Sequence, residues 1–127
     1  MLIRVAAGII ERDGQIFVAL RSSDKHQGGL WEFPGGKVEA DETPQAALSR
    51  ELAEECGIEV QGSESFHVIR HDYSDKSVEL HFYRVFDFAC EPHGKEGQQV
   101  AWVSRQQLTE LAFPEANVPI VDMLQSK

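Results

Sequence analysis

The apolar positions in the first third of the chain follow the spacing of β-strands. Residues 2–11 and 16–21 are two apolar segments on either side of Asp13-Gly14, a dipeptide typical of tight hairpin turns. A third, short strand is expected at 31–33. It leads into the Pro-Gly-Gly sequence at 34–36, where we expect the backbone either to turn sharply or to approach another group closely.

The next segment has the spacing and the end signals of a helix over residues 43–56. Thr43 is suited to the N-cap, Pro44 to the first helical position and Gly57 to the end of the helix. Its apolar side chains form one stripe of Leu48, Leu52 and Cys56, with Ala46, Ser49 and Ala53 beside it. We therefore expect this face to pack and the carboxylates of the helix to point mainly the other way.

The second half of the chain returns to strand patterns before it ends in helices. Strands are expected at 58–71, 77–89 and 100–103. A capping-box pattern at 104–107 opens a short helix, and a loop leads to a last helix at about 119–125. This order predicts an α+β or α/β chain with a mixed sheet and helices packed on its faces.

Length and charge limit the class of protein. The chain has 127 residues, enough for a single domain over 1–127, and no apolar run approaches the ~20 residues that span a membrane. Cys56 and Cys90 have no metal or redox spacing, so we expect a cytoplasmic protein. A formal net charge of −9 argues against binding of a nucleic-acid polymer. It still allows a small anionic substrate if metal cations separate the negative charges.

Three carboxylates crowd one side of the predicted helix. Glu51, Glu54 and Glu55 stand at i, i+3 and i+4, and like charges at these spacings destabilise a helix by roughly 0.2–0.5 kcal/mol per pair. The simplest explanation of such a charge run is a solvated acidic face. A bound divalent cation offsets the repulsion, and all-oxygen ligation favours Mg²⁺, with Mn²⁺ as the alternative.

These carboxylates belong to a longer pattern that decides between the two explanations. It reads Gly36-x5-Glu42-x7-Arg50-Glu51-Leu52-x-Glu54-Glu55-x-Gly57-Ile58 and matches every defined position of the Nudix box. The chain as a whole resembles the MutT-type 8-oxo-dGTP diphosphatases of the Nudix hydrolase family. The resemblance extends to residues 32–37, 94–98 and 113–117.

The resemblance implies both a fold and a reaction. The fold is α+β, an α/β/α sandwich with a central mixed sheet, the Nudix helix at 43–56 and C-terminal helices. The reaction requires a divalent cation and cleaves a nucleoside triphosphate to a monophosphate and diphosphate by attack of water on the β-phosphorus. Such chemistry depends mainly on in-line positioning and on neutralising charge on the phosphate oxygens.

By the same resemblance, the metal ligands are the backbone carbonyl of Gly35 and the carboxylates of Glu51, Glu54, Glu55 and Glu96. Arg50 can orient a glutamate through a charge-assisted hydrogen bond, and Lys37 can neutralise charge on the phosphates. One carboxylate takes the proton of the attacking water. Glu51 and Glu96 are both candidates for that base.

Base recognition is expected to lie outside the acidic helix. The substrate-binding residues that the resemblance implies are Arg21, His26, Glu32, Phe33, Pro34, Gly35 and Asn117. Simpler roles exist for many of them: Asn117 as a cap or turn residue, Phe33 as core, Arg21 and Glu96 as surface charges, and His26 as a solvated loop residue. Tyr73, Asp75 and Lys76 fall in a turn that can reach the substrate, but the pattern there assigns them no role.

The sequence thus predicts a Mg²⁺-dependent hydrolase of 8-oxo-dGTP that removes this mutagenic nucleotide from the pool. Its partner is a small nucleoside triphosphate, without nucleic-acid polymer or membrane, and the protein is expected to act as a monomer. A Nudix pyrophosphohydrolase of CTP or of a modified dCTP is the alternative, because the box itself carries no information about the base. A non-catalytic nucleotide-binding module of the same fold is a third interpretation.

Overall fold

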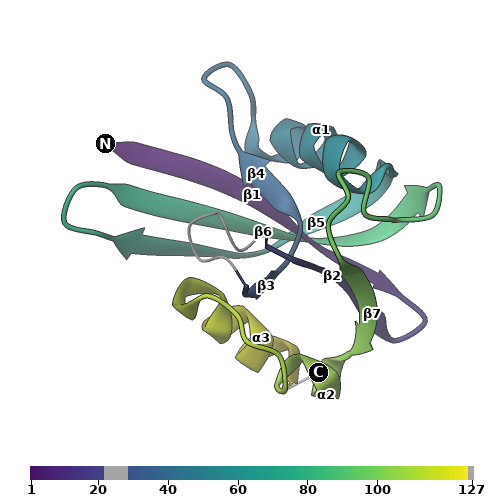
Figure 1. Ribbon diagram of the computed structural model, residues 1–127. Helices are drawn as coiled ribbons and strands as arrows, with labels where there is room; N and C mark the ends of the chain where they lie inside the picture. Colours follow the sequence, from purple (N-terminus) through teal and green to yellow (C-terminus); the bar gives the residue numbers. More distant parts are fainter. Residues whose placement is uncertain (22–28, 126–127) are drawn as a thin grey trace.

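The computed structural model describes residues 1–21 and 29–125, which form a mixed β-sheet between two layers of helices (Figure 1). The strands are β1 (Leu2–Arg12), β2 (Gln15–Leu20), β3 (Trp31–Glu32), β4 (Gly35–Lys37), β5 (Glu59–Asp72), β6 (Ser77–Ala89) and β7 (Val100–Ser104). The helices are α1 (Pro44–Cys56), α2 (Arg105–Leu108), the 3-10 helix η1 (Glu115–Asn117) and α3 (Val118–Gln125). Helix α1 covers one face, and α2 and α3 cover the other, so the predicted α/β/α sandwich is confirmed.

Strand β1 is the centre of the sheet and changes its partner along one edge. It pairs in parallel with β6 on one side, and the main strand order is β3-β2-β1-β6-β5. On the other side, residues 5–7 pair with β4 and residues 10–12 pair with β2, both antiparallel. Between these two pairings, the N–H of Gly8 donates to the carbonyl of Pro34 at 2.8 Å. The segment that enters β4 is therefore held against the middle of β1.

Both faces of β1 are buried, which explains its nearly continuous apolar sequence. Ala6 and Ile10 pack on the side of α1, whereas Ala7 and Ile9 pack on the side of α3. Gly8 lies on the α1 side, where an added Cβ would stand 2.9 Å from Leu52 Cδ1. The absence of a side chain at Gly8 thus lets the middle of α1 lie close to the sheet.

Helix α1 has the predicted ends. The Thr43 hydroxyl accepts a hydrogen bond from the N–H of Ala46 at 3.1 Å, Pro44 begins the helix, and Gly57 ends it with φ +70°. These are local interactions between residues a few positions apart, which is why the sequence alone could predict them.

The buried face of α1 differs from the prediction on one side. Leu48, Leu52 and Cys56 are buried as expected, but the flanking buried residue is Ala47, while Ala46, Ser49 and Ala53 are exposed. Residues at i and i+4 lie above one another, so the column that begins at Ala47 continues through Glu51 and Glu55. Both glutamates are only partly exposed. The expectation that the carboxylates point mainly away from the packed face is therefore wrong for these two.

The chain bends at Pro34, and the extended segment Gly35–Lys37 that follows pairs with β1. The predicted close approach is also found, because a Cβ on Gly35 would collide with the backbone carbonyl of Ala6. The C-terminal helix begins at Val118 and follows the short helix η1 rather than a plain loop. In the described parts of the chain, no helix has both the length and the apolar character needed to cross a membrane.

Candidate active site

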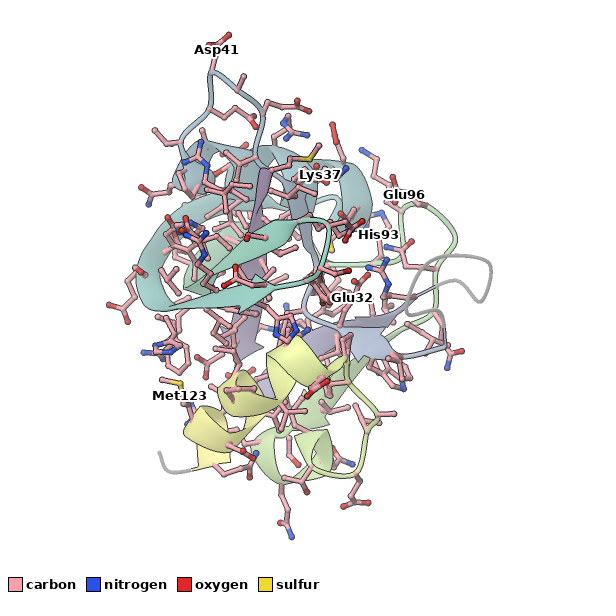
Figure 2. The ribbon with its side chains drawn as sticks, turned by 90° about the vertical axis from the view of Figure 1, so that its left-hand side faces the viewer. Glu32, Lys37, Asp41, His93, Glu96 and Met123 are labelled. Atoms are coloured by element: carbon pink, nitrogen blue, oxygen red, sulfur yellow. The ribbon has the colours of Figure 1, made fainter. Side chains whose placement is uncertain are left out.

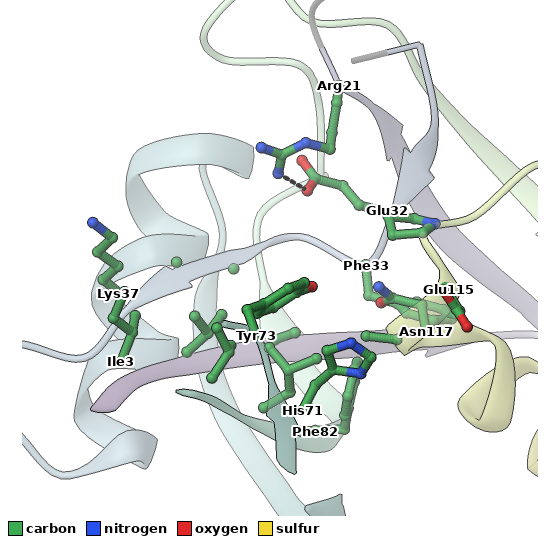
Figure 3. Close-up of a pocket in the computed structure, with 18 of the residues that line it drawn as sticks. Ile3, Arg21, Glu32, Phe33, Lys37, His71, Tyr73, Phe82, Glu115 and Asn117 are labelled. Atoms are coloured by element: carbon green, nitrogen blue, oxygen red, sulfur yellow. Dashed lines mark hydrogen bonds and ion pairs between the residues drawn. The ribbon is translucent and has the colours of Figure 1, made fainter. Parts of the chain in front are cut away.

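A cavity of about 630 Å³ lies on the α3 side of the sheet, over the first half of β1 and of β6. Its apolar floor consists of Ile3, Val5, Ala7, Val78, Leu80 and Phe82. These residues alternate along the two paired strands, so that one face of each strand lines the cavity. Figure 3 shows Lys37 at one end of the cavity and Asn117 with Glu115 at the other.

Aromatic rings form part of the cavity wall near Asn117. Phe33 is 3% exposed, stacks on Phe113 at 5.2 Å between ring centroids, and meets the ring of Phe82 edge-on at 6.1 Å. Because it also lines the cavity, Phe33 is both a core residue and a wall residue. Asn117 is positioned at the end of η1, where its N–H donates to the carbonyl of Pro114 at 2.9 Å.

The predicted substrate-binding residues do not all reach this cavity. Arg21, Glu32 and Gly35 line it, as Phe33 and Asn117 do. Pro34 is buried and is not among the lining residues, and its carbonyl accepts the hydrogen bond from Gly8 of β1. His26 lies outside the described residues.

The turn between β5 and β6 supplies lining residues that the sequence did not assign. Asp75 and Lys76 line the cavity together with Tyr73 and His71. The rings of His71 and Tyr73 lie 4.6 Å apart, and the Lys76 ammonium is 5.9 Å from the centre of the Tyr73 ring. The alternation along β6 indicated which of its residues share a face, but only the parallel pairing with β1 shows that this face borders a cavity.

An acidic cluster borders the Lys37 end of the cavity, around β4 and the last turns of α1. The Glu51 carboxylate packs against Gly36, where an added Cβ would collide with it. Burial raises the pKa of Glu55 to about 9, and a hydrogen bond with Glu51 and the negative charges of Glu32, Glu51 and Glu96 raise it as well. Four carboxylates from three parts of the chain therefore act on one another here.

The cluster has the chemistry of a site for a hard cation. The raised pKa of Glu55 means that its negative charge is costly in this buried, acidic setting, and a divalent cation can offset that cost. Among the described residues, no three acidic, histidine or cysteine side chains are already arranged around a common metal position. Side-chain rotation has to complete a ligand set. The carboxylate oxygens suit Mg²⁺ and Mn²⁺.

Arg50 makes an ion-pair network beside this cluster. Its guanidinium donates two hydrogen bonds to the Glu42 carboxylate, at 2.7 and 2.9 Å, and one to Glu51 at 3.0 Å. Glu54, the partner expected from the sequence, is half-exposed and lies farther away, at 3.4 Å. Arg50 also donates to the backbone carbonyl of Lys37 at 3.0 Å. Arg50 thus orients Glu51 and ties the segment before α1 to the helix.

Glu42 is a residue to which the sequence analysis gave no role. The hydrogen bonds from Arg50, together with one from the N–H of Glu39, lower its pKa to about 2. The hydrogen bond with Glu42 in turn raises the pKa of Arg50. The motif spacing contained the signal, since both residues are defined positions of the box, but the spacing alone did not indicate that they pair.

The loop between β6 and β7 brings Glu96 to the cluster. The N–H of His93 donates to the carbonyl of Cys56, and that of Lys95 donates to the carbonyl of Glu55, both at 3.1 Å. These bonds join the loop to the last turn of α1, whose carbonyls have no partners within the helix. Figure 2 shows Glu32, Lys37, His93 and Glu96 in one region of the molecule, away from Met123.

Glu32 connects the acidic cluster with the cavity. It receives a hydrogen bond from Arg21 at 2.7 Å, an ion pair that is about one-quarter exposed on each side. Its negative charge also contributes to the raised pKa of Glu55. The lining of the cavity therefore presents both the positive charge of Arg21 and the negative charge of Glu32 to a bound ligand.

Comparison with known proteins gives a family and close relatives. The model of the NUDIX domain matches residues 5–123. An 8-oxo-dGTP diphosphatase of Escherichia coli is 40% identical over 96% of this chain and 95% of its own length. A CTP pyrophosphohydrolase of the same organism is also 40% identical, over 95% of this chain and 90% of its own.

Solved structures agree with these relatives. A structure from a study of MutT from Aliivibrio salmonicida and Vibrio cholerae superposes with a TM-score of 0.86. It is 41% identical, and the match covers 98% of this chain and 97% of that one. The solution structure of the ORF135 protein of Escherichia coli gives a TM-score of 0.88 at 38% identity, over 98% of this chain and 89% of the other.

Proposed function

The chain belongs to the NUDIX domain family, and from this membership we propose that it hydrolyses 8-oxo-dGTP to 8-oxo-dGMP and diphosphate. The observation that carries the proposal is the arrangement of the site, in which a cavity of about 630 Å³ borders a cluster of interacting carboxylates. A cavity of this size accommodates a small ligand. The acidic end then lies where the phosphates of a bound nucleotide would extend. A relative named 8-oxo-dGTP diphosphatase, 40% identical over nearly the whole chain, supports the choice of substrate.

In this proposal the base occupies the apolar part of the cavity. The aromatic wall that includes Phe33 offers a surface for a planar base. The side-chain amide of Asn117 both donates and accepts hydrogen bonds, so it can read a purine edge that presents both kinds of group. Oxidation at C8 of guanine adds a carbonyl and protonates N7, which changes the edge that such an amide can contact.

The phosphates occupy the acidic end together with a divalent cation, Mg²⁺ or Mn²⁺. Glu51, Glu54, Glu55 and Glu96 would hold it with the carbonyl of Gly35, and when bound it supplies charge neutralisation and acidifies water. Lys37 and Arg21 lie in the cavity lining, where each can pair with phosphate oxygens.

The protein's own contribution to the reaction is orientation and proton transfer. Arg50 fixes the Glu51 carboxylate, which is 17% exposed and packed against Gly36. Glu96 lies in an exposed turn beside Glu55. One of these two carboxylates takes the proton of the water that attacks the β-phosphorus, and both remain candidates for the base. Replacing Glu51 and Glu96 one at a time by glutamine and measuring kcat against pH identifies the base. Only the variant that lacks the base loses the acidic limb of the pH profile.

A second candidate is hydrolysis of CTP or of a modified dCTP. It is favoured by the relative named CTP pyrophosphohydrolase, which is as similar in sequence as the diphosphatase relative. The acidic end would be the same for either substrate, so only the cavity decides between them.

The test is a turnover panel with Mg²⁺ on 8-oxo-dGTP, dGTP, CTP and 5-methyl-dCTP, with the products separated by ion exchange. We expect the highest kcat/KM for 8-oxo-dGTP and release of diphosphate rather than single phosphates. A higher kcat/KM for CTP or 5-methyl-dCTP would replace the proposed substrate. No turnover of any nucleotide would favour the non-catalytic binding module.

The proposal also includes the surroundings of the enzyme. We expect a cytoplasmic protein that acts as a monomer on a free nucleotide, without nucleic-acid polymer or membrane. Light scattering coupled to gel filtration tests the monomer, which has a mass of 14.2 kDa.

A further inference from the structure

In the Glu96 loop, the side chain of Gln98 makes two hydrogen bonds, one within the loop and one to α1. The amide of Gln98 accepts a hydrogen bond from the N–H of Glu96 at 3.0 Å and donates one to the carbonyl of Glu55 at 2.9 Å. A backbone N–H can only donate and a backbone carbonyl can only accept. The oxygen of the Gln98 amide therefore meets a donor, and its nitrogen meets an acceptor. The two residues that it joins supply two carboxylates of the acidic cluster.

The rest of the loop limits where Glu96 can move. Residues 94–97 form a turn closed by a hydrogen bond from the N–H of Gly97 to the carbonyl of Gly94 at 2.9 Å. Gly97 has φ +85°, and a Cβ on Gly94 would collide with the carbonyl of Gln98. Beyond the turn, the carbonyl of Gln99 accepts from the N–H of Leu20 at 2.9 Å, which fixes the loop to β2.

Glu96 itself is exposed. Within the described part of the chain, its carboxylate makes no side-chain hydrogen bond or ion pair, so its position depends on the backbone that carries it. We propose that Gln98 is a positioning residue, which sets the distance between the Glu96 and Glu55 carboxylates and thereby the geometry of the cation site. The inference rests on the proposed function, because it concerns two of the proposed ligands.

A purely structural role is the competing explanation. The carbonyls in the last turn of α1 need partners, and Gln98 and Lys95 supply them for Glu55. If Gln98 did nothing else, its loss would reduce stability and would affect turnover independently of Glu96. If it acts through Glu96, its loss would have no further effect once the Glu96 carboxylate is removed.

The experiment is a double-mutant cycle of Gln98→Met and Glu96→Gln, with Gln99→Met as the matched control at the next residue. Methionine has nearly the shape of glutamine and makes neither hydrogen bond. Loss of a residue that orients a metal ligand typically lowers affinity or activity by about 10–100-fold, and we expect this loss in kcat and in Mn²⁺ affinity for Gln98→Met, with KM little changed. Mn²⁺ affinity is measured by electron paramagnetic resonance without substrate, so it does not depend on turnover. Gln99→Met should behave as the unmodified protein.

In the Glu96→Gln background, we expect Gln98→Met to lower kcat and Mn²⁺ affinity less than about two-fold further. Hydrogen exchange of the Glu96 N–H should accelerate in Gln98→Met and stay unchanged in Gln99→Met. Equal losses in both backgrounds, or unchanged kcat and Mn²⁺ affinity in Gln98→Met, would overturn the inference. If Gln98→Met does not fold, Gln98→Leu, which also makes neither hydrogen bond and adds no charge, replaces it in the cycle with the same expectations.

The cycle separates this inference from the proposed function. If Glu96→Gln leaves kcat and Mn²⁺ affinity unchanged, Glu96 is not a ligand and the inference is overturned, whereas hydrolysis of 8-oxo-dGTP by the unmodified protein still supports the function. If the unmodified protein hydrolyses no nucleotide, the proposed function fails, and the Mn²⁺ and exchange measurements alone decide the role of Gln98.

Discussion

The two ends of the candidate active site are built in opposite ways. At the acidic end, burial and neighbouring carboxylates raise the pKa of Glu55 to about 9. Arg50 holds the carboxylates of Glu42 and Glu51 in place there. The cavity end consists of apolar strand residues and stacked rings, with Asn117 as a polar group in its lining. One end is arranged by charge and the other by packing.

Each end therefore controls a different property of the protein. In the proposed function a cation neutralises the charge cluster and the reaction takes place there, so changes in the cluster should appear in kcat. A cavity with an apolar floor and an aromatic wall determines which ligand fits, so changes there should appear in the difference between the affinities of two ligands. The packed face of α1 supports the acidic end, and changes there should appear in the free energy of unfolding.

The largest expected effect is that of Glu55→Gln at the acidic end. The variant removes a proposed ligand while keeping the shape of the side chain, and we expect kcat to fall by about 100–10,000-fold with the fold retained. Diphosphate release at saturating Mg²⁺ and circular dichroism measure the two properties. Glu59→Gln, at an exposed position of β5, is the matched control. Near-normal turnover in Glu55→Gln would remove Glu55 from the reaction and break the division between the two ends.

Leu52→Ala should have the next largest effect, on stability instead of rate. Leu52 is fully buried against Gly8 and β1, and loss of such a side chain costs about 2–5 kcal/mol in the free energy of unfolding. Urea denaturation measures it, with Ser49→Ala on the exposed side of α1 as control. We expect kcat per folded molecule to be retained at low temperature. An unchanged midpoint would mean that the helix packs through another face.

A smaller effect is expected from Asn117→Ala at the cavity end. Loss of a hydrogen-bonding partner of a buried ligand group costs about 1–3 kcal/mol, and we expect this in the binding of 8-oxo-dGMP, with a lesser loss for dGMP. Isothermal titration calorimetry with both nucleotides measures the difference. Val118→Ala, at the next and partly exposed residue, is the control. Equal losses for the two nucleotides would reduce Asn117 to a residue that ends η1.

The last expected effect is a gradual pH dependence of the stability of the metal-free protein. Burial raises the pKa of Glu55 from its ordinary value of 4.5 to about 9 in the folded chain, with Glu32, Glu51 and Glu96 facing it. Between these two values the folded state binds more protons than the unfolded state, so stability falls as pH rises. Thermal melting in the presence of a chelator should therefore show a midpoint that declines from about pH 5 to pH 9. The decline should be weaker in Glu55→Gln and after addition of Mg²⁺, and an equal slope in Glu55→Gln would assign it to another group.

The sequence predicted the parts of the fold that depend on neighbours along the chain. The caps of α1 at Thr43 and Gly57 are one example. The hairpin turn is another, since Asp13 and Gly14 both have the positive φ angles, +53° and +77°, that this dipeptide favours. The family resemblance also rests largely on such local spacing, because the motif helix contains most of its defined positions.

The features that the sequence did not predict depend on contacts between distant segments. Nothing in the alternation of β1 or β6 indicates that the two strands pair in parallel, and this pairing creates the cavity floor. The burial of Ala47 in place of Ala46 follows from how α1 meets the sheet, which the helical pattern alone left open. The pairing of Arg50 with Glu42 likewise joins α1 to the segment before it, whereas the sequence suggested only a neighbour on the same helix.

The contact between Gly36 and the Glu51 carboxylate has a consequence for how mutational data on this protein should be interpreted. In a saturation scan scored by nucleotide turnover, every substitution at position 36 should score poorly, alanine included, because any Cβ there would collide with the carboxylate. The position has no functional group of its own, yet its tolerance profile should resemble that of a catalytic residue. A scan scored by protein abundance should be far more permissive at the same position if the displaced carboxylate moves into solvent.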